Sequence, residues 1–75
     1  MDTTHTLRGT IVYQNIEFGF WGIIGSDGNE YLPINLPDRL KSEGKEIFIE
    51  FQEAKNAMSV LMWGTPIEIV SILKN

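Results

Sequence analysis

The fold is decided by the stretch GFWGIIGSDGNEY, residues 19–31, in which two adjacent aromatic residues stand among closely spaced glycines. The segment 18–25 is rich in aromatic and β-branched residues, which predicts a strand. Its glycines would cost about 1 kcal/mol each inside a helix, but in a strand they allow sharp coiling and close backbone approach. Asp27-Gly28 is a strong hairpin signal, because glycine supplies the positive φ of a tight turn. We therefore expect a coiled strand over 18–25 and an antiparallel strand over 30–34.

Periodicity predicts further strands on both sides of this hairpin. Apolar and polar residues alternate over 6–14 and again over 46–52, which is the period of a strand with one buried face. The second of these segments carries Phe48 at an outward position. A last extended region over 58–73 contains Gly64-Thr65-Pro66, and we expect a kink there because proline is tolerated in sheets only at edges and bulges.

A short helix is expected between the third and fourth strands. Pro37 suits the first turn of a helix and Gly44 suits its C-terminal cap, which predicts about two turns over 37–43. The resulting order of elements is that of an OB-fold. We therefore expect a mainly β protein, a small five-stranded OB-like β-barrel formed by residues 1–75 as a single domain. A Src-homology-type barrel is the rival fold, and it would lack the helix.

Composition narrows the classes of function. The 75 residues include no cysteine and one histidine, His5, and they contain neither a signal peptide nor an apolar run of the roughly 20 residues that span a bilayer. We expect a soluble, cytoplasmic protein that is not an enzyme and has no cofactor, no metal site and no membrane contact. The formal net charge is −4 and the basic residues are scattered, which makes nucleic acid an unlikely partner because phosphate binding needs clustered Lys and Arg. Turn chemistry explains Asp27, Asn29 and Glu30 better than metal binding does.

The ligand site is expected on the outer face of the second and third strands, where OB-folds bind. The second strand is apolar on both faces, with Phe18, Phe20 and Ile24 on one and Trp21 and Ile23 on the other. Since a barrel has one interior, something must cover the other face from outside. The predicted binding residues, between the loops 14–17 and 53–57, are Trp21, Ile23, Tyr31 and Trp63. Aromatic residues of this kind are enriched at binding hot spots.

Two resemblances support the barrel. Residues 9–34 resemble cold-shock domains, and the matching residues, in order, are Gly9, Thr10, Asn15, Gly19, Phe20 and Asp27-Gly28. The lysine that precedes the glycine-aromatic motif of that family is replaced by Phe18, and Trp21 is an inserted residue. The blocks GFWGIIGSDGNEYLPINLP and MSVLMWGTPIEI resemble a small single-domain prokaryotic family of OB type with no assigned function.

The function expected from these observations is a non-catalytic binding or interaction module. Its partner would be a protein or peptide, or a second copy of the chain, and such binding would be insensitive to salt. The cold-shock resemblance implies an alternative, binding to single-stranded nucleic acid, and that binding would depend steeply on salt.

Overall fold

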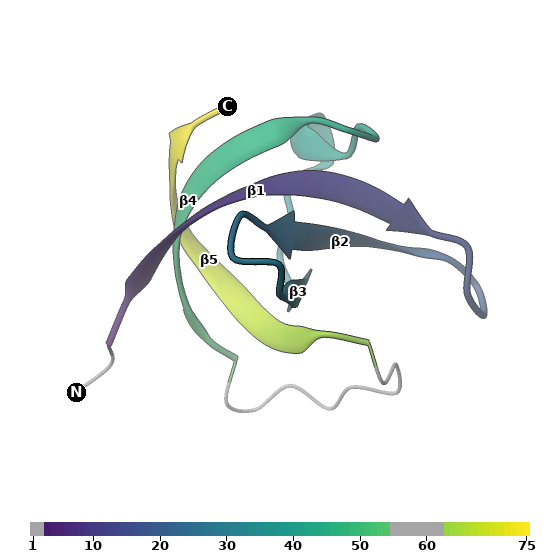
Figure 1. Cartoon of the computed structure of the whole chain (residues 1–75), viewed down its shortest axis with the longest axis horizontal. Helices are drawn as coiled ribbons and strands as arrows, with labels where there is room; N and C mark the ends of the chain where they lie inside the picture. Colours follow the sequence, from purple (N-terminus) through teal and green to yellow (C-terminus); the bar gives the residue numbers. More distant parts are fainter. Residues whose placement is uncertain (1–2, 55–62) are drawn as a thin grey trace.

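Five strands close into a barrel in the computed structural model, which describes residues 3–54 and 63–75 (Figure 1). The strands are β1 (His5–Gln14), β2 (Phe20–Gly25), β3 (Glu30–Pro33), β4 (Glu46–Glu53) and β5 (Thr65–Lys74). Their order around the barrel is β1-β2-β3-β5-β4, and β4 returns to pair with β1. The β3–β5 pair is parallel and the other pairs are antiparallel. The predicted mainly β, OB-like five-stranded barrel is therefore confirmed.

The alternation of side chains along each strand separates an inner from an outer face. Ile11 of β1 lies opposite Ile23 of β2 and both are completely buried, which places them inside the barrel. The core cluster consists of Leu7, Ile11, Ile23, Leu40, Ile47, Ile49, Ile67 and Ile69. Phe48 lies on the outer face of β4, as predicted, and the guanidinium carbon of Arg8 stands 4.5 Å from the centre of its ring. Pairing with a cation thus accommodates an aromatic ring outside the core.

β2 begins at Phe20, later than the predicted start at Phe18. The N–H of Gly19 donates to the carbonyl oxygen of Ile16 (2.9 Å), so residues 16–19 form a turn before the strand. At the other end of β2, Gly28 has a φ of +87°, which is the left-handed conformation expected for the Asp27-Gly28 hairpin.

The predicted helix is shorter than expected. It is a single 3₁₀ turn, η1 (Asp38–Leu40), rather than about two turns over 37–43. Pro37 precedes it without a side-chain capping bond, and Lys41 already leaves the helical region with a ψ of 81°. Leu40 is 1 % exposed and belongs to the core cluster. One turn therefore suffices to place Leu40 against the barrel interior. The chain then returns to β1, where the N–H of Gly44 donates to the carbonyl oxygen of Ile11 (2.8 Å).

The predicted kink at Gly64-Thr65-Pro66 is confined to Gly64, which lies in a bend just before β5 and has a φ of +72°. β5 starts at Thr65, and Pro66 is already paired, opposite Leu32 in the parallel pair with β3. The irregularities of β5 occur later, where its register against β4 skips Val70 and Leu73. Such bulges bend a strand and help a sheet to close. Residues 55–57 of the predicted loop and 58–62 of the predicted extended region lie outside the described residues.

Asn35 replaces a missing strand partner beside β5. β3 ends at Pro33, and the next backbone bond to β5 runs from the N–H of Ile34 to the carbonyl of Ile67 (2.9 Å). The side-chain amide of Asn35 then donates to the carbonyl oxygen of Ile69 (2.9 Å) and accepts from the N–H of Ile69 (2.8 Å). A single side chain thus satisfies both backbone groups of a buried residue in β5.

Asn35→Ala is expected to lower the free energy of unfolding by about 2 kcal/mol, because it leaves two partly buried backbone groups without their partners. Asn35→Asp should also destabilise the fold, since a carboxylate cannot donate to the Ile69 carbonyl. Urea denaturation measures both effects. Asn75→Ala, at the exposed C-terminal residue, is the control and should change stability by less than about 0.5 kcal/mol. Equal stability of all three variants would contradict this role.

Candidate functional site

The two faces of β2 are the reverse of those predicted. Ile23 is completely buried in the core, and Trp21 is half-buried and packs against the same core. Both residues therefore point into the barrel, and their predicted place on an outer ligand-binding face is wrong. Both faces of β2 are apolar, so its sequence lacks the polar alternation that would have indicated the outer one.

The outer face of β2 is covered by Trp63, which lies two residues before the start of β5. A Cβ atom added to Gly22 would overlap the six-membered ring of Trp63, so the indole lies directly on the strand backbone. The Trp63 ring also packs edge-on against Phe20, with ring centres 5.3 Å apart at an interplanar angle of 64°. Phe20 is consequently only 9 % exposed, although it lies outside the core cluster. The cover required by the apolar outer face is thus supplied by the chain itself.

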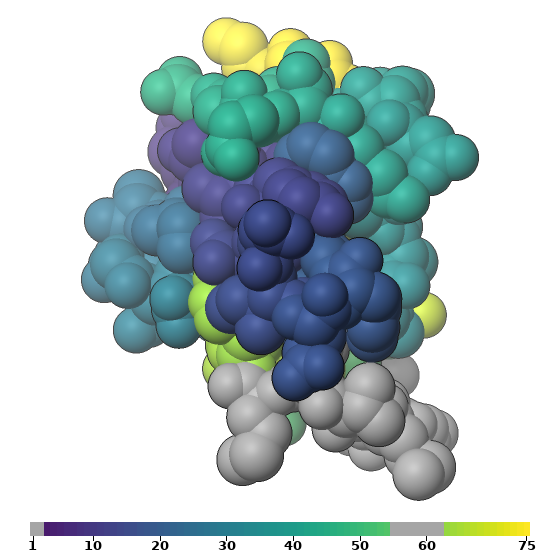
Figure 2. Space-filling model, turned by 90° about the vertical axis from the view of Figure 1, so that its right-hand side faces the viewer, coloured from purple at the N-terminus to yellow at the C-terminus, as the bar shows by residue number. Residues whose placement is uncertain are grey.

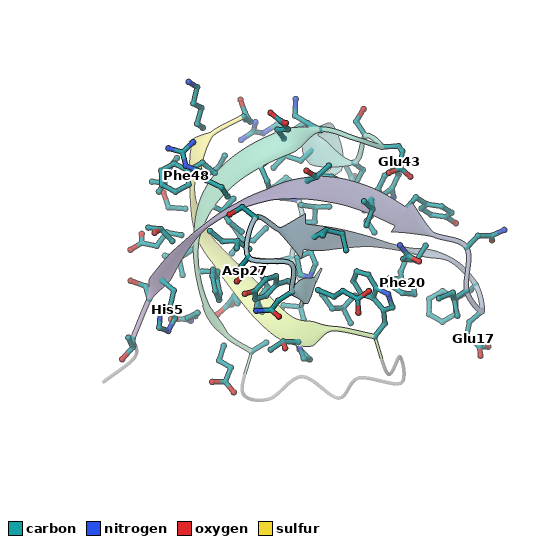
Figure 3. All side chains as sticks on the ribbon, viewed as in Figure 1. His5, Glu17, Phe20, Asp27, Glu43 and Phe48 are labelled. Carbon is teal, nitrogen blue, oxygen red and sulfur yellow. The ribbon has the colours of Figure 1, made fainter. Side chains whose placement is uncertain are left out.

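Tyr31 lies at one mouth of the barrel. It stands opposite Ile23, and its ring centre is 5.6 Å from that of Phe51. His5 also packs against Phe51, with its ring centre 5.6 Å from that of Phe51. A cavity of about 570 Å³ opens here, and its lining includes His5, Asp27, Tyr31, Phe51, Glu53 and Thr65. We call these six residues the Tyr31–Phe51 mouth; His5 and Asp27 mark it on the left of Figure 3.

Asp27 is the charged centre of this mouth. Its carboxylate accepts hydrogen bonds from the N–H of Asn29 (3.0 Å), from the Asn29 side-chain amide (3.2 Å) and from the Tyr31 hydroxyl (2.8 Å). The bonds from the Asn29 backbone and from Tyr31 lower the pKa of Asp27, and the same contact with Asp27 raises the pKa of Tyr31. The predicted turn chemistry of Asp27 and Asn29 is confirmed by these bonds. Within residues 3–54 and 63–75, no group of three His, Cys, Asp or Glu side chains is arranged to hold a metal ion.

The opposite end of the molecule carries exposed apolar side chains at the end of β1 and on its connection to β2. Phe18 is 76 % exposed, Ile16 is 46 % exposed and Tyr13 is 42 % exposed. Figure 1 shows this connection projecting beyond the barrel on the right, and Figure 2 shows it from that end, in dark blue at the middle of the face. We call Tyr13, Ile16 and Phe18 the hairpin-tip patch.

The structure distributes the four predicted binding residues over separate places. Ile23 lies in the core, Tyr31 at the mouth and Trp63 on the outer face of β2. Trp21 lies inside, near the hairpin tip, with its ring centre 5.0 Å from that of Tyr13. The binding-site prediction missed Phe18 and Ile16. The sequence signal that could have indicated them is the presence of apolar residues in a turn. It also missed Phe51, which reads in the sequence as an ordinary core position.

Comparisons of the chain with protein-family models, with curated proteins and with solved structures find no match. The resemblance to a prokaryotic OB-type family therefore stays a prediction. None of the helical structure in the described residues has the length and hydropathy needed to cross a membrane. Two surfaces at the ends of the barrel are candidates for binding, the hairpin-tip patch and the Tyr31–Phe51 mouth.

Tyr31→Phe is expected to raise the pKa of the Asp27 carboxyl toward its ordinary value, because one of the bonds to the carboxylate is lost. A carboxyl with a lowered pKa stabilises the fold above its unfolded pKa, and this contribution is lost as the pH falls through the folded pKa. The stability difference between the wild type and Tyr31→Phe should therefore be larger at pH 7 than at about pH 2. Carboxyl ¹³C NMR titration and denaturation at both pH values measure the two effects. Tyr13→Phe is the control and should leave the Asp27 titration unchanged.

Proposed function

We propose that the chain is a non-catalytic interaction module that binds a partner protein through the hairpin-tip patch. The observation that carries this proposal is the 76 % exposure of Phe18 at the tip of a projecting hairpin, beside Ile16 and Tyr13. A large aromatic side chain in this position buries little of its surface in the isolated chain. Aromatic anchors of this kind supply much of the binding energy at protein interfaces.

Local contacts hold the patch in a defined shape. The bond from Gly19 to Ile16 closes the turn, and Glu17 between them has a φ of +58°, which costs a residue with a side chain roughly 1–2 kcal/mol. The N–H of Tyr13 donates to the Glu43 carboxylate (3.1 Å), and the Tyr13 ring packs edge-on against Trp21. A preorganised tip loses little conformational entropy when it binds.

The charges at the tip favour a partner of a different kind over a second copy. Glu17 lies within the turn and the Glu43 carboxylate lies at the base of the patch, both exposed. Two tips meeting in a symmetric dimer would bring like charges together, and the net charge of −4 would add to the repulsion. The partner that fits is a protein with an apolar pocket for Phe18 and basic residues around its rim.

Single-stranded nucleic acid remains the alternative, and it has less support. OB-folds that bind such strands present aromatic side chains and basic residues on the face that includes β2. In this chain Trp63 covers Gly22 and Phe20 on that face, so bases would have to displace the indole before they could stack on β2.

The test replaces Phe18 with the photo-crosslinking residue benzoylphenylalanine in the cells that express the chain. Val70, which is 51 % exposed on β5, receives the same replacement as a control for exposed apolar positions. We expect a covalent adduct with one defined protein from position 18 and none from position 70. With that protein purified, Phe18→Ala should weaken binding about 30-fold, and Val70→Ala less than twofold. Both variants should keep the stability of the wild type to within about 0.5 kcal/mol.

Three results would overturn the proposal. Equal adducts from both positions would show that the crosslinks are nonspecific. An adduct only with a second copy, together with dimers in sedimentation, would replace the partner by self-association. Unchanged affinity of Phe18→Ala for the purified partner would remove the patch from the interface.

A further inference from the structure

We propose that the Tyr31–Phe51 mouth is a second binding site, separate from the hairpin tip, and that it takes a guanidinium group on an aliphatic stem. The two surfaces lie at opposite ends of the molecule, as the positions of His5 and Glu17 in Figure 3 show. The cavity of about 570 Å³ at the mouth is large enough for a ligand of the size of an amino-acid side chain and its backbone.

The walls of this cavity are aromatic and its deepest lining is apolar. The Phe51 ring packs against both the Tyr31 ring, tilted by 58°, and the His5 ring, tilted by 39°. Leu7 and Ile67, both buried core residues, also line the cavity. Ring faces attract a planar cation, and the apolar lining suits the methylene groups of its stem.

The charge of the mouth is negative and has no cation of its own among the described lining residues. Asp27 and Glu53 contribute carboxylates, whereas those lining residues include neither Lys nor Arg. The hydrogen-bond donors to Asp27, which are Asn29 and Tyr31, are neutral, so they hold its carboxylate in place without cancelling its charge. The ion pair formed by Lys41 with Asp38 lies at η1, away from the mouth.

This combination selects a guanidinium over other ligands. An anion would be repelled by Asp27 and Glu53, and the mouth lacks the three-ligand group that a metal ion needs among the described residues. A guanidinium is planar, stacks on aromatic rings and donates hydrogen bonds in a fixed fork that matches a carboxylate. A neutral ligand of the same shape would use the rings and leave the negative charge of both carboxylates without a cation.

The test is a ¹H–¹⁵N NMR titration of the full chain with L-arginine amide, against L-citrulline amide as a neutral ligand of almost the same shape. We expect saturable shifts concentrated at Asp27, Tyr31 and Phe51 with arginine amide, and affinity at least tenfold lower for citrulline amide. A short peptide with a central arginine forms a second arm. If the peptide binds more tightly than arginine amide, the guanidinium that the mouth takes belongs to a peptide side chain. If the peptide binds equally or more weakly, the guanidinium belongs to a small molecule.

Glu53→Gln and Phe51→Leu should each weaken binding of arginine amide fivefold or more. Glu46→Gln removes the same charge from the other end of β4 and should change the affinity less than twofold. Glu53 is exposed, so Glu53→Gln keeps the test valid even if Phe51→Leu fails to fold. Phe18→Ala should bind arginine amide like the wild type, which separates this site from the proposed partner interface.

The inference is overturned if arginine amide produces no saturable shifts, or if citrulline amide binds equally well. It is also overturned if Glu46→Gln weakens binding as much as Glu53→Gln, since overall charge rather than the mouth would then explain the effect.

Discussion

The contact between the Trp63 indole and the backbone of Gly22 is the constraint on which the arrangement of this barrel depends. β2 is apolar on both faces, and the barrel interior takes only the face with Trp21 and Ile23. The opposite face needs a cover, and an indole can lie flat on the strand only where the residue beneath it has no side chain. Because Trp63 covers Phe20 in this way, the surface that OB-folds use for ligands is occupied by the chain itself.

This cover moves the available binding surfaces to the two ends of the barrel. At one end, the turn that precedes β2 leaves Phe18 exposed on a hairpin held by the bond from Gly19 to Ile16 and by the bond from Tyr13 to Glu43. At the other end, the Asp27-Gly28 turn that reverses the chain also holds a carboxylate beside two aromatic rings. The first surface is apolar with an acidic edge, and the second is aromatic with buried apolar residues beneath it. Such different surfaces suit different ligands, so one small barrel has room for both.

The fold followed from signals that are local in the sequence, whereas the site did not. Alternation over 6–14 and 46–52 predicted β1 and β4, and the Asp27-Gly28 turn predicted the hairpin of β2 and β3. Periodicity could not assign the faces of β2, because a strand that is apolar on both sides has no polar residue to mark the outer one. The positions of Trp63 and Asn35 are set by tertiary contacts with Gly22 and Ile69. These partners are far away in the sequence, and no local pattern encodes the pairing.

The most direct test of this account is a nuclear Overhauser measurement on the aromatic side chains of the native protein. We expect strong cross-peaks from the six-membered ring of Trp63 to the α protons of Gly22 and to the Phe20 ring. We also expect cross-peaks from the Trp21 ring to Tyr13. Cross-peaks from Trp63 to core residues such as Ile23, with none to Gly22, would contradict this arrangement, because the outer face of β2 would then be open.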